Sequence, residues 1–320
     1  MNIAPCKICG NEDFDFLFDG KDRMHYLPGS FKLYQCRKCR LIFLYPPLTG
    51  KALEQYYPKD YYSYDNSRRA EPVKSRRQKI FHFLKHPIEA CNCLLYSKFL
   101  DLNRPLDTPR DCRLLDVGCG DGRFLLEKFE SGCFCFGNDI SRAALDRLHS
   151  RQPAIETRCG DLWDVNYPDD FFDVINMSHV IEHVPDVNRL LAEAHRVLKK
   201  GGVLRIQVPN AASFTFMIFR KYWMPLEVPR HVYAFSVQNL KTLFKKTGFD
   251  VVCSRTAEGS FTFFASIIFV LGAFFRRKID FMQCERIWNS EILKMLFFPY
   301  AWFVNTLHRG DTAEFLLTKT

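Results

Sequence analysis

Four cysteines near the N-terminus form the most specific chemical pattern of the chain. Cys6 and Cys9 make one Cys-x-x-Cys pair, and Cys36 and Cys39 make a second. Two such pairs can supply four thiolates to one tetrahedral Zn²⁺, which leaves no open position for catalysis. Reduced cysteines without a metal are the alternative. The pattern predicts a structural zinc site in a small ribbon-like module, because a short segment with few apolar residues gains folding free energy from a metal.

A glycine-rich turn between a predicted strand and a predicted helix is the second pattern. The segment LDVGCGDG places Gly118, Gly120 and Gly122 just after Asp116. Such a turn lets the backbone approach a ligand at the carboxyl end of a strand. A dinucleotide fingerprint would need a glycine at position 123, where the chain has Arg123. The loop carboxylates would also repel a pyrophosphate, whereas they suit an ammonium or a sulfonium.

Acidic residues follow the next two predicted strands. Asp139 ends the second strand, where a carboxylate can accept hydrogen bonds from both hydroxyls of a ribose. Asp161 and Leu162 follow the third strand, where they can reach the amino group and the face of an adenine. Capping of helices is the alternative role for each aspartate. The order and spacing of these residues together favour the ligand-binding interpretation.

The elements that must position these residues follow from hydrophobic patterning after residue 110. Short apolar runs alternate with amphipathic helical segments, which is the pattern of βαβ units on a parallel sheet. We therefore expect an α/β fold. The predicted strands are 113–117, 133–138, 155–159, 172–177, 203–208, 251–254 and 314–319, and helices are expected over 189–198 and 237–247.

The motifs LDVGCGDG, NDIS, GDL, VINMSHVIEHVPD and LKKGGVLRIQVPN, spread over residues 112–255, resemble the class I S-adenosylmethionine-dependent methyltransferases. The resemblance implies a Rossmann-like sheet with helices on both faces and S-adenosylmethionine as cofactor. The residues that it assigns to the cofactor are Asp116, Gly118, Cys119, Gly120, Gly122, Asp139, Ile140, Asp161, Leu162, Met177 and Ser178.

The wider layout is similar to bacterial methyltransferases that carry an N-terminal zinc module. The four cysteines lie ahead of the sheet motifs, and the segment PRHVYAFS lies behind them. Members of that group act on sugars and other small biosynthetic intermediates. The resemblance therefore implies a small-molecule acceptor, such as a sugar, a nucleotide-linked sugar or a cell-surface glycan precursor.

Candidate catalytic residues lie on the acceptor side of this layout. His179, Glu182 and His183 follow the strand at 172–177 and are spaced to share one helical face. His231 and Tyr233 form a second candidate pair. Ubiquinone-pathway O-methyltransferases have a similar E-x-x-E-H pattern, but His179 replaces its first glutamate, which argues against a metal-assisted mechanism. Bracing of the helix is the alternative role of Glu182 and His183.

The chain divides into four predicted segments. Residues 1–67 form the zinc-binding module with a tyrosine-rich tail, and 68–110 form a basic connector and a helix. The S-adenosylmethionine-binding domain covers 111–258, and 259–320 hold a helical insertion and the closing strand. We expect the tyrosines of the tail, Tyr56, Tyr57, Tyr61, Tyr62 and Tyr64, to pack against the main domain, with the acceptor pocket as the alternative.

The chain has 45 Lys and Arg against 36 Asp and Glu, a formal net charge of +9. This charge favours an acidic partner, such as nucleic acid, an anionic membrane or a phosphorylated substrate. An RNA methyltransferase is one alternative, although the Asn/Asp-Pro-Pro-aromatic motif of many base methyltransferases is missing at 176–179, which reads NMSH. A non-catalytic zinc-ribbon adaptor is another, against which the intact glycine loop argues.

The start MNIAPCKICG lacks the apolar core of a secretory signal, so we expect a cytoplasmic protein. The scattered cysteines, Cys112, Cys159 and Cys253 among them, are then expected to be buried small side chains. The apolar runs 261–275 and 297–302 are too short to span a bilayer and too apolar to lie exposed. The core, a second subunit or lipid can cover them. We expect burial in the core, with lipid as an alternative for which the basic cluster at 276–278 supplies a cationic flank; peripheral contact with the inner membrane face would fit a lipid-linked acceptor.

Overall fold

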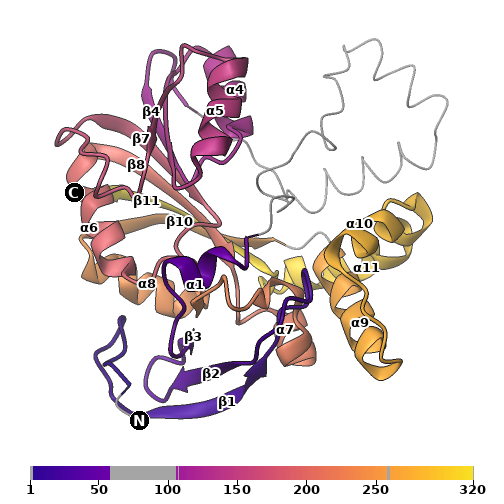
Figure 1. The fold of residues 1–320 in the computed structure, drawn as a ribbon. Coiled ribbons are helices and arrows are strands. Elements are labelled where there is room, and N and C mark those ends of the chain that lie inside the picture. Colours follow the sequence, from indigo (N-terminus) through magenta and orange to yellow (C-terminus); the bar gives the residue numbers. More distant parts are fainter. Residues whose placement is uncertain (1–2, 58–105, 107, 258–259, 320) are drawn as a thin grey trace.

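The computed structural model describes residues 3–57, 106, 108–257 and 260–319. Its main body is a seven-stranded sheet in the order β10-β11-β8-β7-β4-β5-β6 (Figure 1). The strands from β8 to β6 are parallel, and β11 is antiparallel to both of its neighbours. The strands are β4 (Arg113–Val117), β5 (Phe134–Asp139), β6 (Glu156–Cys159), β7 (Phe172–Ser178), β8 (Leu198–Pro209), β10 (Phe249–Ala257) and β11 (Thr312–Lys319).

Helices cover both faces of this sheet, as the predicted fold class requires. Helices α4 (Arg123–Glu130) and α5 (Arg142–Arg151) pack on the face that buries Leu114, and α6 (Val187–Val197) and α8 (Val237–Lys246) pack on the opposite face, which buries Leu115. Successive strand residues point to opposite faces, so each face gains its own apolar core. The predicted α/β fold is confirmed.

The order of the strands creates a crevice beside the carboxyl ends of the central strands. From β4 the chain moves outward through β5 and β6, and then returns to β7 on the other side of β4. The connections after β4 and β7 therefore leave in opposite directions. Ligands of open α/β sheets bind at such a switch point, beside the carboxyl ends of the strands.

A second sheet joins the N-terminal module to the main domain. Strands β1 (Phe14–Gly20), β2 (Phe31–Cys36) and β3 (Ile42–Leu44) pair in sequence order, and β3 then pairs with β9 (Tyr233–Ala234). The short helix α1 (Lys51–Glu54) follows. Strand β9 belongs to the segment between β8 and α8, so backbone hydrogen bonds tie the module to the main chain of the larger domain. Figure 1 shows this sheet below the main sheet.

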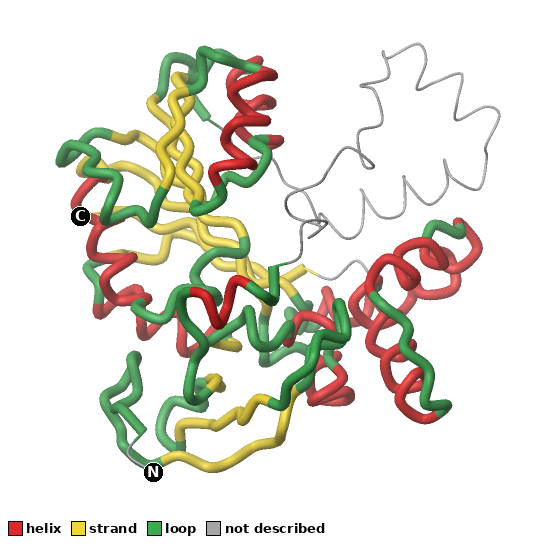
Figure 2. Tube along the Cα trace, in the orientation of Figure 1, coloured by secondary structure: helices red, strands yellow, loops and turns green. Residues whose placement is uncertain are grey.

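The predicted helical insertion lies between β10 and β11. It consists of α9 (Phe261–Phe274), α10 (Phe281–Trp288) and α11 (Glu291–Thr306), which Figure 2 shows beside the rest of the fold as a separate helical group. The short elements α7 (Phe214–Phe219), η1 (Arg220–Tyr222) and η2 (Met224–Leu226) connect it to the body, because α9 packs against all three. Among the described residues, no helix is long and apolar enough to cross a bilayer.

The predicted start of one strand and the predicted burial of two cysteines differ from the structure. Strand β8 starts at Leu198 rather than at residue 203, because the chain is already extended directly after α6. Cys112 is buried as expected, but Cys159 and Cys253 are exposed, since β6 and β10 are the two edge strands of the sheet. The basic connector, the helix near 80–101 and the tyrosines at 61, 62 and 64 lie outside the described residues.

The four N-terminal cysteines lie together in the second sheet's end loops. Cys6 Sγ is 3.5 Å from Cys39 Sγ, Cys9 Sγ is 3.6 Å from Cys36 Sγ, and all four sulfurs lie within 4.8 Å of one another. Four Zn–S bonds of about 2.3 Å in a tetrahedron separate the sulfurs by about 3.8 Å. The cysteine arrangement therefore fits a zinc ion. A hydrogen bond from Cys39 lowers the pKa of the Cys6 thiol to about 5.

Both Cys-x-x-Cys turns have the same backbone geometry. The amide of Gly10 donates to the carbonyl of Cys6 at 2.9 Å, and the amide of Arg40 donates to the carbonyl of Cys36 at 3.0 Å. Gly10 and Arg40 both have positive φ values, 70° and 64°. This conformation is unfavourable for arginine. Its presence at Arg40 is therefore consistent with a backbone shape that the four-cysteine site requires in both turns.

We expect the purified protein to hold one zinc ion per chain and Cys36→Ser to lose it. Cys36 is fully buried, so the variant should unfold the N-terminal sheet, because the metal supplies folding free energy there. Elemental analysis and limited proteolysis measure the two effects. Cys253→Ser, at an exposed cysteine, is the control and should keep the zinc. A folded, metal-free wild-type protein would contradict this prediction.

Candidate active site

A cleft of about 1130 Å³ opens at the carboxyl ends of β4 to β7. It lies at the switch point of the sheet, where the glycine loop between β4 and α4 forms one wall. The predicted cofactor residues that line it are Asp116, Gly118, Cys119, Gly120, Asp139, Ile140, Asp161, Leu162 and Ser178. The structure thus brings together most of the residues that the motifs assigned to one ligand.

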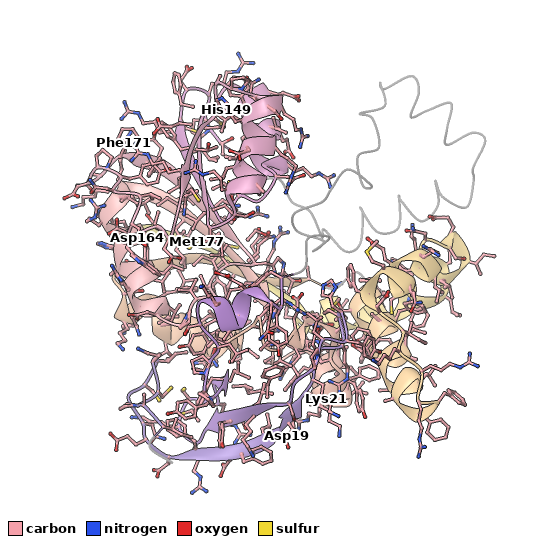
Figure 3. All side chains as sticks on the ribbon, in the orientation of Figure 1. Asp19, Lys21, His149, Asp164, Phe171 and Met177 are labelled. Atoms are coloured by element: carbon pink, nitrogen blue, oxygen red, sulfur yellow. The ribbon has the colours of Figure 1, made fainter. Side chains whose placement is uncertain are left out.

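Gly122 and Met177 are the two assigned residues that do not line the cleft. A Cβ at Gly122, whose φ is 77°, would lie 2.3 Å from Leu148, so this glycine allows α4 and α5 to pack closely. Met177 is fully buried in the apolar core and lies at the centre of the main domain (Figure 3). Because side chains alternate along β7, its neighbours Asn176 and Ser178 face the cleft instead.

Asp139 holds the glycine loop as well as facing the cleft. Its Oδ2 accepts from the amide of Gly120 at 2.9 Å, and its Oδ1 accepts from the amide of Ser141 at 2.8 Å. Each carboxylate oxygen can accept a further hydrogen bond. Both oxygens therefore remain able to accept hydrogen bonds from a diol in the cleft, and the two amides already orient the carboxylate.

Asp116 is buried at the base of the cleft. It accepts a hydrogen bond from Asn176 Nδ2 at 2.7 Å, but burial raises the pKa of its carboxyl to about 7. Behind it, Arg205 is buried between Asn176 and Glu314, with 2.6 Å from its Nε to Glu314 Oε1. Sequence reasoning missed Asn176 and Arg205. A cation in the cleft would favour the ionised form of Asp116.

The segment after β7 forms turns rather than the predicted helix face. His179 has a positive φ of 56°, and α6 begins only at Val187, so the helical spacing assumed for His179, Glu182 and His183 is wrong. His179 and Glu182 nevertheless meet, with 3.2 Å between Nδ1 and Oε1. Glu182 is fully buried, and its Oε2 has no hydrogen-bond partner among the described residues.

His183 and His231 face each other at the edge of the cleft. Their ring centroids are 4.5 Å apart and the rings are perpendicular. Tyr57 lies beside them, with 3.1 Å between its hydroxyl and His183 Nδ1. Burial, and then the charge of His231, lower the pKa of His183 to about 4. His183 is therefore a neutral imidazole near pH 7. Tyr57 lines the cleft, whereas Tyr56 packs and donates to the carbonyl of Pro28.

Both ring nitrogens of His231 lie close to oxygen atoms of neighbouring residues. Its Nδ1 lies 2.8 Å from the carbonyl oxygen of Pro225, and its Nε2 lies 3.1 Å from Glu227 Oε2. Burial opposes ionisation of Glu227, but the hydrogen bond and charge of His231 hold the pKa of this carboxyl far below its usual range. Sequence reasoning missed Glu227, although its position four residues before His231 is a usable signal. Tyr233, the other predicted partner, donates to the carbonyl of Pro185 and lines neither cavity.

Glu182, His183 and His231 offer three ligand atoms within 4.8 Å of one another, which is close enough to hold a metal ion. Both ring nitrogens of His231, however, already face oxygen atoms, the carbonyl of Pro225 and the carboxylate of Glu227. A metal would have to displace the ion pair with Glu227. The hydrogen bonding therefore favours an acid–base cluster over a metal site. This agrees with the sequence, in which His179 replaces the first glutamate of the E-x-x-E-H pattern.

A second cavity of about 370 Å³ adjoins the cleft. His179 lines both cavities, and His231 lines the second one. The histidine cluster therefore lies at the junction between them. The four zinc-site cysteines line neither cavity, which agrees with a structural role.

Part of this sequence is similar to O-methyltransferases from bacteria. The chain is 33% identical over 123 residues to the malonyl-[acyl-carrier protein] O-methyltransferase of Serratia marcescens. The matched region covers 38% of this chain and 48% of that protein. It is 30% identical over 162 residues to the ubiquinone biosynthesis O-methyltransferase of Cereibacter sphaeroides, covering 48% of this chain and 65% of that protein. The chain thus spans about half to two thirds of these relatives.

Among solved structures, an S-adenosylmethionine-dependent methyltransferase from Mesorhizobium loti aligns over 67% of this chain and 94% of its own, with a TM-score of 0.45 and 18% identity. The family model described as a methyltransferase domain matches residues 67–254, more than half of the chain. The chain therefore belongs to the methyltransferase domain family.

Proposed function

We propose that the protein transfers the methyl group of S-adenosylmethionine to a hydroxyl of a small acceptor, which is a sugar, a nucleotide-linked sugar or a cell-surface glycan precursor. One observation carries this proposal. The cleft at the switch point of the sheet and the smaller second cavity meet at His179, beside the pair His183 and His231. A donor in the cleft and an acceptor in the second cavity would place the reacting atoms between them.

The chemistry of the cleft suits S-adenosylmethionine. Asp139 offers two preoriented acceptors for the ribose hydroxyls, and Asp116 offers a carboxylate for the cationic methionine part. Ile140 is 63% exposed in the cleft, which leaves an apolar side chain available to cover an adenine ring. Each group matches one part of the cofactor, and this match supports the assignment made from the motifs.

His183 is the residue best suited to remove the acceptor proton. The acceptor oxygen attacks the methyl carbon, the carbon–sulfur bond breaks, and S-adenosylhomocysteine leaves with the electron pair of that bond. The hydroxyl proton passes to His183, which is neutral and lines the cleft. Glu182 is adjacent and fully buried, so its charge stabilises the imidazolium that forms. Positioning of the two reactants supplies the rest of the rate.

We propose in addition that the insertion rests on an anionic membrane and that the acceptor is lipid-linked. Most of the large apolar side chains that lie exposed among the described residues belong to the insertion between β10 and β11, either to its three helices or to the residues that directly follow α9 and α11. Arg276, Arg277 and Lys278 follow α9 directly and supply the cations that anionic headgroups attract. The exposed apolar residues are Leu271, Phe274, Phe275, Met282, Ile287, Ile292, Met295, Leu296, Trp302, Phe303 and Leu307.

Methyl transfer to a panel of acceptors tests the proposed function. The full chain is incubated with methyl-labelled S-adenosylmethionine and a panel of free sugars, nucleotide sugars and polyprenyl-phosphate sugars. Label should appear in at least one sugar product. Labelled RNA instead would favour the RNA methyltransferase alternative, and a protein that binds neither S-adenosylmethionine nor S-adenosylhomocysteine would contradict the proposal as a whole.

Asp139→Ala should weaken the binding of S-adenosylhomocysteine by about 1.5–3 kcal/mol, because charge-assisted hydrogen bonds to the ribose are lost. Asp139→Asn keeps one acceptor oxygen and should lose less. Titration calorimetry measures both. Asp146→Ala, at an exposed aspartate on α5, is the matched control and should bind as the wild type does. Equal affinities for Asp139→Ala and this control would disprove the ribose contact.

His183→Ala should reduce kcat by roughly 100-fold or more, while the affinity for S-adenosylhomocysteine changes little. His231→Gln removes the neighbouring cation and should raise the pKa of His183 from about 4, so the acid limb of the pH–rate profile should move to higher pH. The acceptor found in the panel serves as substrate. His149→Ala, at an exposed position, is the control. A wild-type rate in His183→Ala would transfer the role to Glu182 or His179.

The membrane proposal predicts flotation with liposomes that contain anionic lipid and none with neutral ones. Replacement of Arg276, Arg277 and Lys278 by glutamine should weaken binding by about 1 kcal/mol per residue, and Phe274→Ser should weaken it further. Val252→Ser, at an exposed apolar residue of β10, is the control. A protein that stays monomeric and does not bind anionic liposomes contradicts the proposal. A stable dimer would show instead that a second copy of the chain covers the exposed apolar residues of the insertion.

A further inference from the structure

The second cavity has a wall that the methyltransferase core does not supply. The core contributes Pro209 and His179, whereas α9 and α10 of the insertion contribute Phe261, Phe281 and Trp288. We propose that this cavity is a specificity subsite, built by the insertion, that takes an uncharged polyhydroxylated ring and keeps phosphate out. This inference rests on the proposed function, since it names the part of the acceptor that the second cavity binds.

One face of α10 lines the cavity. Phe281, Glu285, Trp288 and Asn289 all border it, and their spacing of four, seven and eight residues from the first is that of a single helix face. Met282, which does not line it, is exposed. The helix therefore presents aromatic and hydrogen-bonding groups together to whatever occupies the cavity.

The aromatic side chains of this wall pack against each other. The ring centroids of Phe261 and Phe281 are 5.7 Å apart and the two rings are perpendicular. The ring centroids of Phe261 and Trp288 are 6.0 Å apart. Trp288 also contacts Phe264 at 5.3 Å. Rings at these distances leave no room for a group between them, so they form a continuous surface rather than a cage. A cage is the arrangement that binds quaternary ammonium groups, whereas the face of one aromatic ring in a closed wall suits the apolar face of a pyranose.

Polar groups border this apolar surface. Glu285 and Asn289 extend from the same helix face, and Thr262 lies on the neighbouring helix. Carboxylate and amide oxygens accept hydrogen bonds from hydroxyl groups, and the amide nitrogen donates one. A ring that has one apolar face and hydroxyls around its edge matches both parts of the wall at once.

The charge of the lining disfavours phosphate. Among the described lining residues there is no lysine or arginine, while Glu227, Glu285 and Asp311 bring three carboxyl groups. His231 also belongs to the lining, and its Nε2 lies 3.1 Å from Glu227 Oε2. Asp311 accepts a hydrogen bond from Trp223 Nε1 at 2.6 Å. A phosphate in the cavity would meet these carboxyl groups and no lysine or arginine of the lining, so a nucleotide or lipid carrier is expected to stay outside.

Fluorine NMR of the full chain labelled with 5-fluorotryptophan tests this subsite. The four tryptophans, Trp163, Trp223, Trp288 and Trp302, give four signals that single Trp→Phe variants assign. Trp163 lines the cofactor cleft and reports S-adenosylhomocysteine, whereas Trp302 is 48% exposed and serves as the reference. The probes are methyl glycosides of common hexoses and 6-deoxyhexoses, choline and inorganic pyrophosphate, each added at up to tens of millimolar.

We expect at least one methyl glycoside to shift the Trp288 signal saturably and to leave the Trp302 signal unchanged. Glu285→Gln should weaken that binding at least fivefold, and Met282→Ala, at an exposed residue of α10 that does not line the cavity, should not change it. Pyrophosphate and choline should leave the Trp288 signal in place.

A Trp288 signal that no glycoside moves, or that choline or pyrophosphate moves instead, overturns the inference. The Trp163 signal separates this failure from that of the proposed function. If S-adenosylhomocysteine shifts Trp163 while every glycoside leaves Trp288 unchanged, the methyltransferase proposal stands and the subsite is wrong. If S-adenosylhomocysteine shifts nothing, the proposed function fails, and the subsite fails with it as an acceptor site.

Discussion

The buried guanidinium of Arg230 connects the two halves of the molecule. It is fully buried, and its Nη2 lies 2.9 Å from Oδ1 of Asp22, which is also fully buried and follows β1. Its Nη1 donates to the carbonyl of Tyr56 at 2.9 Å, and its Nε lies 3.4 Å from Glu227 Oε1. A buried charge that loses its partners is strongly destabilising. The N-terminal sheet and the loop of His231 must therefore keep their relative positions.

This constraint explains how a metal held by the four N-terminal cysteines, outside both cavities, would matter for chemistry. The cysteine loops hold the ends of β1 to β3, and Asp22 directly follows β1. Asp22 positions Arg230, and Glu227 lies within ion-pair distance of both Arg230 and His231. Loss of the metal would thus loosen the support of the histidine pair without removing a group that touches a substrate. The same chain of contacts holds Glu227 at its positive φ of 40°, which is unfavourable for a glutamate.

Sequence patterns predicted what depends on local structure. The strands β4 to β7 and the ends of α6 and α8 lie within a few residues of their predicted bounds, because apolar runs, glycines and caps are read over short segments. The cleft residues follow from the same turns. Met177 was misplaced because the alternation along β7 was not applied to the motif, although that signal was present. The predicted helical face at His179 failed because nothing local shows that a residue with positive φ precedes the helix.

The histidine cluster, by contrast, depends on contacts between distant segments. Tyr57, His183 and Glu227 come from the module tail, the turn after β7 and the loop before β9. No spacing in the sequence brings these three together, and only Glu227 carries a local signal through its distance from His231. The pKa of His183 is lowered by burial and by this assembled charge, so its role could not be derived from residue types alone.

The place of the insertion follows from the register of the last two strands. Thr312, the first residue of β11, pairs with Pro209 at the carboxyl end of β8 and with Ala257 at the end of β10. Any segment that connects β10 to β11 must therefore leave and return at the edge of the sheet where the cavities open. Pro209 itself lines the second cavity. A change in the length or side chains of this connection would therefore alter the wall of the second cavity without touching the cleft at β4 to β7. If the proposed function holds, the connection between β10 and β11 would select the acceptor, while the strands β4 to β7 would hold the methyl donor.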